Sequence, residues 1–91
     1  MTGRQVFYEG RVQGVGFRFT VKMIARGYEV TGWVRNRDDG RVEMQVGGEE
    51  TEVRGFLDAI GQSELRAHIR NQTECHLSAP PAARGFEIRH E

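Results

Sequence analysis

The sequence is short of cysteine and of net charge, and each shortage excludes a class of protein. A single cysteine, Cys75, excludes an internal disulfide, and the three scattered histidines form no recognisable metal-ligand pattern with it. Thirteen basic and thirteen acidic side chains cancel, so the chain lacks the positive excess that marks nucleic-acid and membrane-surface binding. No apolar run approaches a membrane-spanning length. We therefore expect a cytoplasmic protein without a metal ion.

Alternating and helical patterns divide the first half of the chain into a strand, a helix and a hairpin. Apolar residues recur at even spacing over residues 4–12, which predicts a half-buried strand. From Phe17 to Tyr28 the spacing changes to three and four, which predicts a helix that ends near Gly27. Residues 31–37 and 42–46 have strand character, and Asp38-Asp39-Gly40 between them is typical of a hairpin turn.

The second half contains one clear helix and a less regular remainder. Gly47-Gly48 is expected to end the preceding strand, and the acidic run 49–52 suits the first turn of a helix that Gly61 would cap. The buried stripe of that helix is expected to be Val53, Phe56, Leu57 and Ile60. The later expected elements are a strand at Ala67 and Ile69, an edge continuation over Asn71 to Ser78, a loop at Pro80-Pro81 and a short last strand at Phe86 and Ile88.

This order of elements predicts an α+β fold. A strand, helix, strand, strand, helix, strand pattern is a split βαβ arrangement, and each helix has one apolar stripe to bury. Both helices can cover one face of a mainly antiparallel sheet of four to five strands. We expect a ferredoxin-like α/β sandwich that forms one domain over residues 1–91.

The segment Gly10 to Arg18 has the composition of a phosphate-binding loop. Its glycines let backbone amides approach an oxyanion, the start of a helix leaves N–H groups without partners, and Arg18 adds a charged bidentate donor. It lacks the Gly-Lys-Ser/Thr ending of a nucleotide P-loop, and Phe19 stands where a dinucleotide fingerprint needs a third small residue. A plain strand-to-helix turn with an exposed arginine would show the same spacing.

A second segment, Gly32 to Gly40, places Asn36 at the end of a strand. A neutral amide donates to one partner and accepts from a water molecule without repelling an anion. Asn36 could equally serve the turn that follows it.

Together the two segments resemble the signatures of the acylphosphatase family. These are Gly-x-Val-Gln-Gly-Val-Gly-Phe-Arg and Gly-Trp-Val-x-Asn followed by Asp-Gly, and both are present without a gap. The ending Gly85 to Arg89 is similar to the family's last strand, whereas Gln62 to Arg84 follows no family pattern.

The resemblance implies hydrolysis of a carboxyl-phosphate anhydride to a carboxylate and inorganic phosphate, without metal or cofactor. It implies that Arg18 and Asn36 are catalytic, with Asn36 positioning the attacking water. The phosphoryl group would be held by Gln13, Gly14, Val15, Gly16, Phe17 and Arg18. The expected partners are a small acyl phosphate and inorganic phosphate, with no nucleic acid and no membrane, and the enzyme is expected to be a monomer. The acyl group is not identified.

Three alternatives stay open at this point. Ferredoxin-like sheets also bind single-stranded RNA through exposed aromatic residues, and Trp33 lies among arginines. Domains similar to acylphosphatase also occur inside longer maturation enzymes, and a non-catalytic phosphate-binding relative would keep the same fold.

His68, His76 and His90 are interpreted as exposed bystanders, and Cys75 as a buried or edge-strand thiol.

Overall fold

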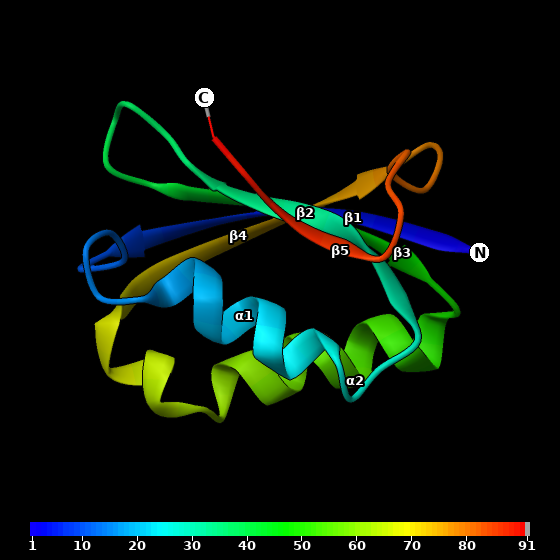
Figure 1. The fold of residues 1–91 in the computed structure, drawn as a ribbon, viewed down its shortest axis with the longest axis horizontal. Coiled ribbons are helices and arrows are strands. Elements are labelled where there is room, and N and C mark those ends of the chain that lie inside the picture. Colours follow the sequence, from blue (N-terminus) through cyan, green and yellow to red (C-terminus); the bar gives the residue numbers. More distant parts are fainter. Residues whose placement is uncertain (91) are drawn as a thin grey trace.

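The computed structural model describes residues 1–90 and contains a five-stranded sheet with two helices on one face (Figure 1). The elements follow in the order β1 (Thr2–Gly10), α1 (Phe17–Ala25), β2 (Val30–Asn36), β3 (Val42–Gly48), α2 (Glu50–Gly61), the 3-10 helix η1 (Glu64–His68), β4 (Ile69–Leu77) and β5 (Phe86–Arg89). The ferredoxin-like α+β prediction is confirmed, including the two helices and the edge strand near the end of the chain.

The strands are ordered β4-β1-β3-β2-β5, and only the pairing of β2 with β5 is parallel. Because β3 is antiparallel to both β1 and β2, those two strands run in the same direction. The carboxyl ends of β1, β2 and β5 therefore meet at one edge of the sheet. This edge receives the loop before α1, Asn36 and the residues after β5.

The core lies between the sheet and the helices, as the apolar periodicity requires. Even-numbered residues of β1 and β3 face the helices, and the predicted stripe of α2 is buried against them. Phe7, which interrupts the alternation in β1, lies on the opposite face beneath the guanidinium groups of Arg37 and Arg41. An aromatic side chain at this outward-facing position of β1 is therefore explained by its contacts with arginine and not by burial in the core.

Four details of the sequence-based prediction are wrong. The helix from Phe17 ends at Ala25 rather than near Gly27, although Tyr28 still packs on the core. Gly61 is the last residue of α2 and not its cap, which is Gln62. Ala67 lies in η1, so the edge strand begins only at Ile69.

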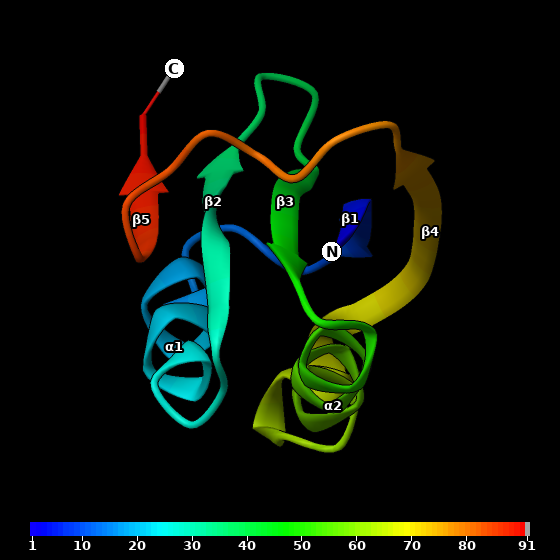
Figure 2. The same ribbon diagram turned by 90° about the vertical axis from the view of Figure 1, so that its right-hand side faces the viewer.

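Gly47 and Gly48 continue β3 instead of ending it. The segment between β4 and β5 crosses the helix-free face of the sheet here, as Figure 2 shows. A Cβ atom on Gly47 would lie 2.8 Å from Cβ of Pro80 and 2.9 Å from Cδ of Pro81. Glycine is thus used at Gly47 for close packing of this crossing segment and not for a turn.

Candidate active site

The shape of the loop between β1 and α1 depends on two glycines. Gly14 has φ 79° and Gly16 has φ 75°, and no other residue type among residues 1–90 has a positive φ, so the sign alternates from Gln13 to Phe17. Such alternation turns successive N–H groups toward one side and forms a concave anion nest. No heavy atom lies within 4 Å of a Cβ built on either glycine. Glycine is therefore favoured at these two positions by the backbone conformation, and not because a larger side chain would clash with its surroundings.

The nest continues into the start of α1. Gly16 is the N-cap and makes no side-chain cap bond, and its carbonyl accepts the first helical hydrogen bond, from Thr20 N at 3.0 Å. The N–H groups of residues 17–19 therefore have no partner within the helix. They add the positive end of the helix dipole to the loop.

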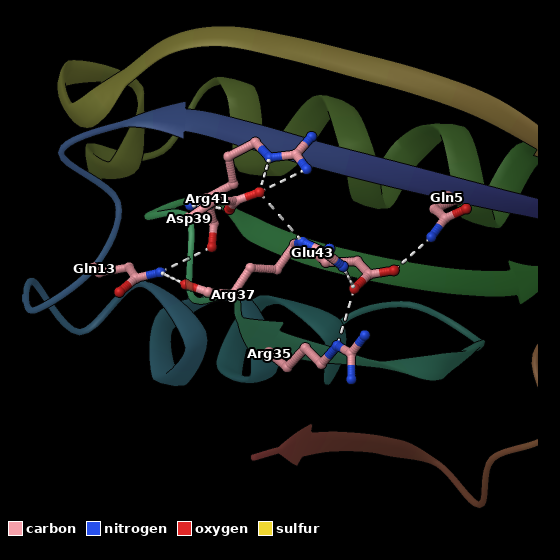
Figure 3. A network of polar contacts seen from close by, with 7 residues as sticks. All are labelled: Gln5, Gln13, Arg35, Arg37, Asp39, Arg41 and Glu43. Carbon is pink, nitrogen blue, oxygen red and sulfur yellow. Dashed lines mark hydrogen bonds and ion pairs between the residues drawn. The ribbon is translucent and has the colours of Figure 1, made fainter. Parts of the chain in front are cut away.

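Gln13 fastens this loop to the hairpin between β2 and β3. Its Nε2 donates to the carbonyl of Arg37 at 2.7 Å and to the carbonyl of Arg41 at 2.9 Å (Figure 3). The two hydrogens of the amide are thereby used, so the side chain of Gln13 positions the loop. This amide therefore has no N–H left to donate to a ligand.

Two open hollows meet at Arg18, Asn36 and His90. The first, of about 520 Å³, is lined only by polar and charged residues, namely the shared three together with Gln13, Arg37 and Asp38. The second, of about 400 Å³, adds glycine and apolar residues to the same three, namely Val12, Gly14, Gly16, Phe17, Phe19 and Ile88. Both volumes fall within the roughly 300–1,000 Å³ of small-molecule sites. The structure thus brings Arg18 and Asn36 together.

Asn36 is the last residue of β2 and lies on the helix side of the sheet. It shares a row with Val42 and Tyr8, because Val42 pairs with both across the sheet. Its Oδ1 is buried and has no hydrogen-bond partner among residues 1–90. A buried acceptor without a partner carries a desolvation cost of about 1–3 kcal/mol. Asn36 lines both hollows, but this oxygen is not exposed to them.

Arg18 and Arg37 both line the first hollow but differ in their pairing. Arg37 Nη1 donates to Glu43 Oε1 at 2.9 Å, and its Nε lies 3.6 Å from Asp39 Oδ2. Within residues 1–90 the guanidinium of Arg18 has no hydrogen bond or ion pair. The charge of Arg18 is consequently free for an anionic ligand.

Glu43 anchors the network that holds Arg37 in place (Figure 3). Glu43 is 4% exposed, and its carboxylate accepts from Gln5 Nε2 at 2.5 Å, Arg35 Nε at 2.9 Å and Arg37 Nη1 at 2.9 Å. Burial acts to raise the pKa of Glu43, but the hydrogen bonds from Arg35 and Arg37 outweigh burial and lower the pKa. Glu43 is therefore ionised at neutral pH and fixes the position of Arg37.

Comparisons with known proteins agree with this geometry. The acylphosphatase family model matches residues 4–88. An acylphosphatase of Geobacillus thermodenitrificans is 41% identical over 85 residues, which make up 93% of this chain and 90% of that protein. The crystal structure of the acylphosphatase from Bacillus subtilis has a TM-score of 0.87 at 34% identity and covers 98% of this chain and 99% of that one. The chain belongs to the acylphosphatase family.

The fold also occurs within a much longer protein. The crystal structure of HypF from T. kodakarensis matches with a TM-score of 0.83 at 26% identity, and this chain spans 12% of its length. An acylphosphatase-like domain is thus compatible with a larger architecture as well as with the full-length match to the acylphosphatase from Bacillus subtilis.

The RNA-binding alternative is not favoured by the helix-free face of the sheet. Trp33 is only 8% exposed, and the guanidinium groups of Arg35 and Arg89 each lie 5.3 Å from its ring centroid. Phe7 is covered in the same way, with Arg41 at 4.4 Å. Base stacking needs an accessible ring face, which the buried Trp33 lacks, and Phe7 is half-buried beneath an arginine.

His90 is one of the site-lining residues that the sequence analysis missed, together with Arg37, Asp38, Phe19 and Ile88 among others. It follows β5, whose parallel pairing places Arg89 beside Arg35 and so brings His90 toward Asn36. No motif marks this histidine, and only the pairing of β5 could have located it. His68 and His76 line neither hollow, and Cys75 is exposed on edge strand β4.

Among residues 1–90 there is no cluster of three or more histidine, cysteine or acidic side chains arranged to hold a metal ion. Over the same residues, no helix is long and apolar enough to cross a membrane. Metal independence, cytoplasmic location and a monomeric state stay predictions.

Proposed function

We propose that this hydrolase acting on acid anhydrides grips the phosphoryl group of an acyl phosphate and directs one water molecule at it. The backbone amides of residues 13–18 and the guanidinium of Arg18 bind the phosphoryl oxygens. The amide of Asn36 positions the attacking water. The place of Asn36 beside the unpaired Arg18 in the lining of both hollows supports this proposal most directly.

The arrangement suits a reaction whose leaving group is already good. Water attacks phosphorus, the bond from phosphorus to the acyl oxygen breaks, and the bonding electrons leave with the carboxylate. The transition state is loose and spreads charge over the phosphoryl oxygens, so positioning and charge stabilisation supply most of the acceleration. A phosphoryl oxygen of the substrate takes the proton from the water. The reaction therefore needs no strong general base from the protein.

Hydrolysis of benzoyl phosphate and of p-nitrophenyl phosphate, both in excess chelator, tests the reaction class. We expect cleavage of the acyl phosphate alone, because the phosphomonoester has a poorer leaving group and the proposed reaction uses no general acid to protonate it. Cleavage of neither compound would leave only a phosphate-binding role. Cleavage that disappears with chelator would overturn metal independence.

Arg18→Gln tests the phosphate grip and should lower turnover at least about a hundredfold, as the loss of a transition-state charge contact does. Inorganic phosphate should also bind more weakly as a competitive inhibitor. Arg66→Gln is the matched control, since Arg66 is exposed in η1 and lines neither hollow. Near-normal hydrolysis by Arg18→Gln would refute the assignment.

Asn36→Ala tests the positioning of water. We expect turnover to fall roughly a hundredfold while the inhibition constant of inorganic phosphate stays within about twofold, because binding of the anion and orientation of the water are separate tasks. Asn71→Ala on the exposed strand β4 is the control. If phosphate affinity fell and turnover at saturation were unchanged, Asn36 would be a phosphate ligand instead.

A further inference from the structure

The exposed apolar side chains of this protein gather beside the proposed phosphate site. Apart from Met1, the large apolar residues exposed among residues 1–90 are Val15 at 39%, Phe19 at 63% and Met23 at 42%. Phe19 and Met23 are four residues apart and form one stripe along α1, and Val15 lies just before the helix in the phosphate loop. An exposed apolar cluster next to a polar site is a feature of ligand-binding surfaces.

Of these three residues, only Phe19 both lies in α1 and lines one of the two hollows. Phe19 lines the second hollow opposite Ile88, whereas Met23, one turn further along α1, lines neither of the two. Phe19 makes no aromatic pair with another ring in the described part of the chain, while Phe17, two residues earlier, is buried with its ring 5.0 Å from that of Tyr8. The ring of Phe19 is therefore not required by the core.

The two hollows differ in chemistry although they share Arg18, Asn36 and His90. The first presents Arg37, Asp38 and Gln13, and the second presents Phe19 and Ile88. A phosphoryl group held at Arg18 thus has a polar space and an apolar space beside it. In-line displacement places the attacking water and the leaving acyl oxygen on different sides of phosphorus, which requires two such spaces.

We propose that the second hollow is an acyl-binding subsite, in which Phe19 and Ile88 select substrates with an aromatic or branched aliphatic acyl group. This inference rests on the proposed function, because it takes the phosphoryl position from it. An apolar acyl group gains contact with Phe19 and Ile88 and loses little hydration. A carboxylate-bearing acyl group would lose hydration in the same place without gaining a partner. The polar first hollow is left for water.

The test compares kcat/KM for benzoyl, acetyl and succinyl phosphate in the full-length protein. The wild-type enzyme should prefer benzoyl phosphate, with succinyl phosphate the poorest of the three. Phe19→Ala should lower the ratio of benzoyl to acetyl phosphate by roughly five- to tenfold, as the loss of an aromatic contact does, through KM for benzoyl phosphate. Phe19→Leu should give an intermediate ratio. Met23→Ala, the control from the same stripe, should leave the ratio unchanged.

Other results of these assays would show whether the acyl subsite or the proposed function is wrong. An equal loss on benzoyl and acetyl phosphate in Phe19→Ala would mean that Phe19 only supports the loop, and this would overturn the subsite. A change of the ratio in Asp38→Ala but not in Phe19→Ala would place the acyl group in the first hollow. Wild-type hydrolysis of acetyl phosphate without any benzoyl preference would overturn the subsite and leave the proposed function intact. Hydrolysis of none of the three would overturn both.

Discussion

Glu43→Gln removes one charge from the network behind the site while it preserves the shape of the side chain. The carboxylate is held by Gln5, Arg35 and Arg37, and its side chain is 6% exposed. Glutamine can keep a neutral carbonyl oxygen for Arg35 and Arg37, which both donate to Oε1, but it presents an NH₂ group to Gln5, where Oε2 was the acceptor. The variant therefore tests whether the charge of Glu43, rather than its packing, holds the hairpin side of the hollow.

The size of the loss follows from the number of bonds and from their exposure. A hydrogen bond to a charged group contributes about 1.5–3 kcal/mol, and breaking a fully buried pair costs about 3–5 kcal/mol. The side chains of Arg35 and Arg37 are 34% and 33% exposed, so both recover water when the carboxylate is lost. We expect the free energy of unfolding to fall by about 2 kcal/mol at pH 7. Glu87→Gln, which breaks an exposed pair with Arg89, should cost under about 0.5 kcal/mol.

The pH dependence gives the decisive comparison. Because the pKa of Glu43 is lowered in the folded state, its stabilisation is complete above the ordinary value of 4.5 and is lost as the pH falls through the folded-state pKa. Urea unfolding followed by the fluorescence of Trp33 should thus show a smaller difference between the wild type and Glu43→Gln at pH 3 than at pH 7. An equal difference at the two pH values would refute the charge argument, and so would a loss at pH 7 no larger than that of Glu87→Gln.

Three further variants probe the loop, the core and the crossing segment. Gln13→Ala removes both hydrogen bonds to the hairpin, so KM for acetyl phosphate should rise several-fold in steady-state assays while the fold persists in circular dichroism. Tyr8→Phe deletes a buried hydroxyl without a partner among residues 1–90, so thermal unfolding should show no loss and a gain of up to about 1 kcal/mol. Gly47→Ala places a Cβ against Pro80 and should cost about 1–3 kcal/mol in urea unfolding, with kcat unchanged because Gly47 lies in neither hollow.

The sequence was sufficient for the parts of the site that depend on local chemistry and on connectivity. Gly14 and Gly16 predict a loop whose backbone can approach an oxyanion, and in the structure both glycines have a positive φ. A strand, helix, strand crossover returns the chain parallel to its first strand, which brings Asn36 to the same edge as Arg18. Their roles in binding phosphate and positioning water stay predictions.

Alternation could not predict that Glu43 is buried. The pattern in residues 42–46 correctly assigns Glu43 to the face away from the helices. Whether that face is covered depends on side chains from other strands, and here Arg35 and Arg37 reach across to the carboxylate. A period of two identifies a face of a sheet and carries no information about what lies on it.

The edge at which three strands end explains how a short chain can build this site without a long active-site loop. β1, β2 and β5 point the same way, and β3 separates β1 from β2, so their last residues are held apart by a rigid strand. The nest before α1 enters from β1, Asn36 ends β2, and His90 follows β5. Each group is thus fixed by sheet hydrogen bonds close to its own position. The groups are therefore held in place before the substrate binds. Catalysis that works by positioning the reactants requires this when the leaving group is already activated.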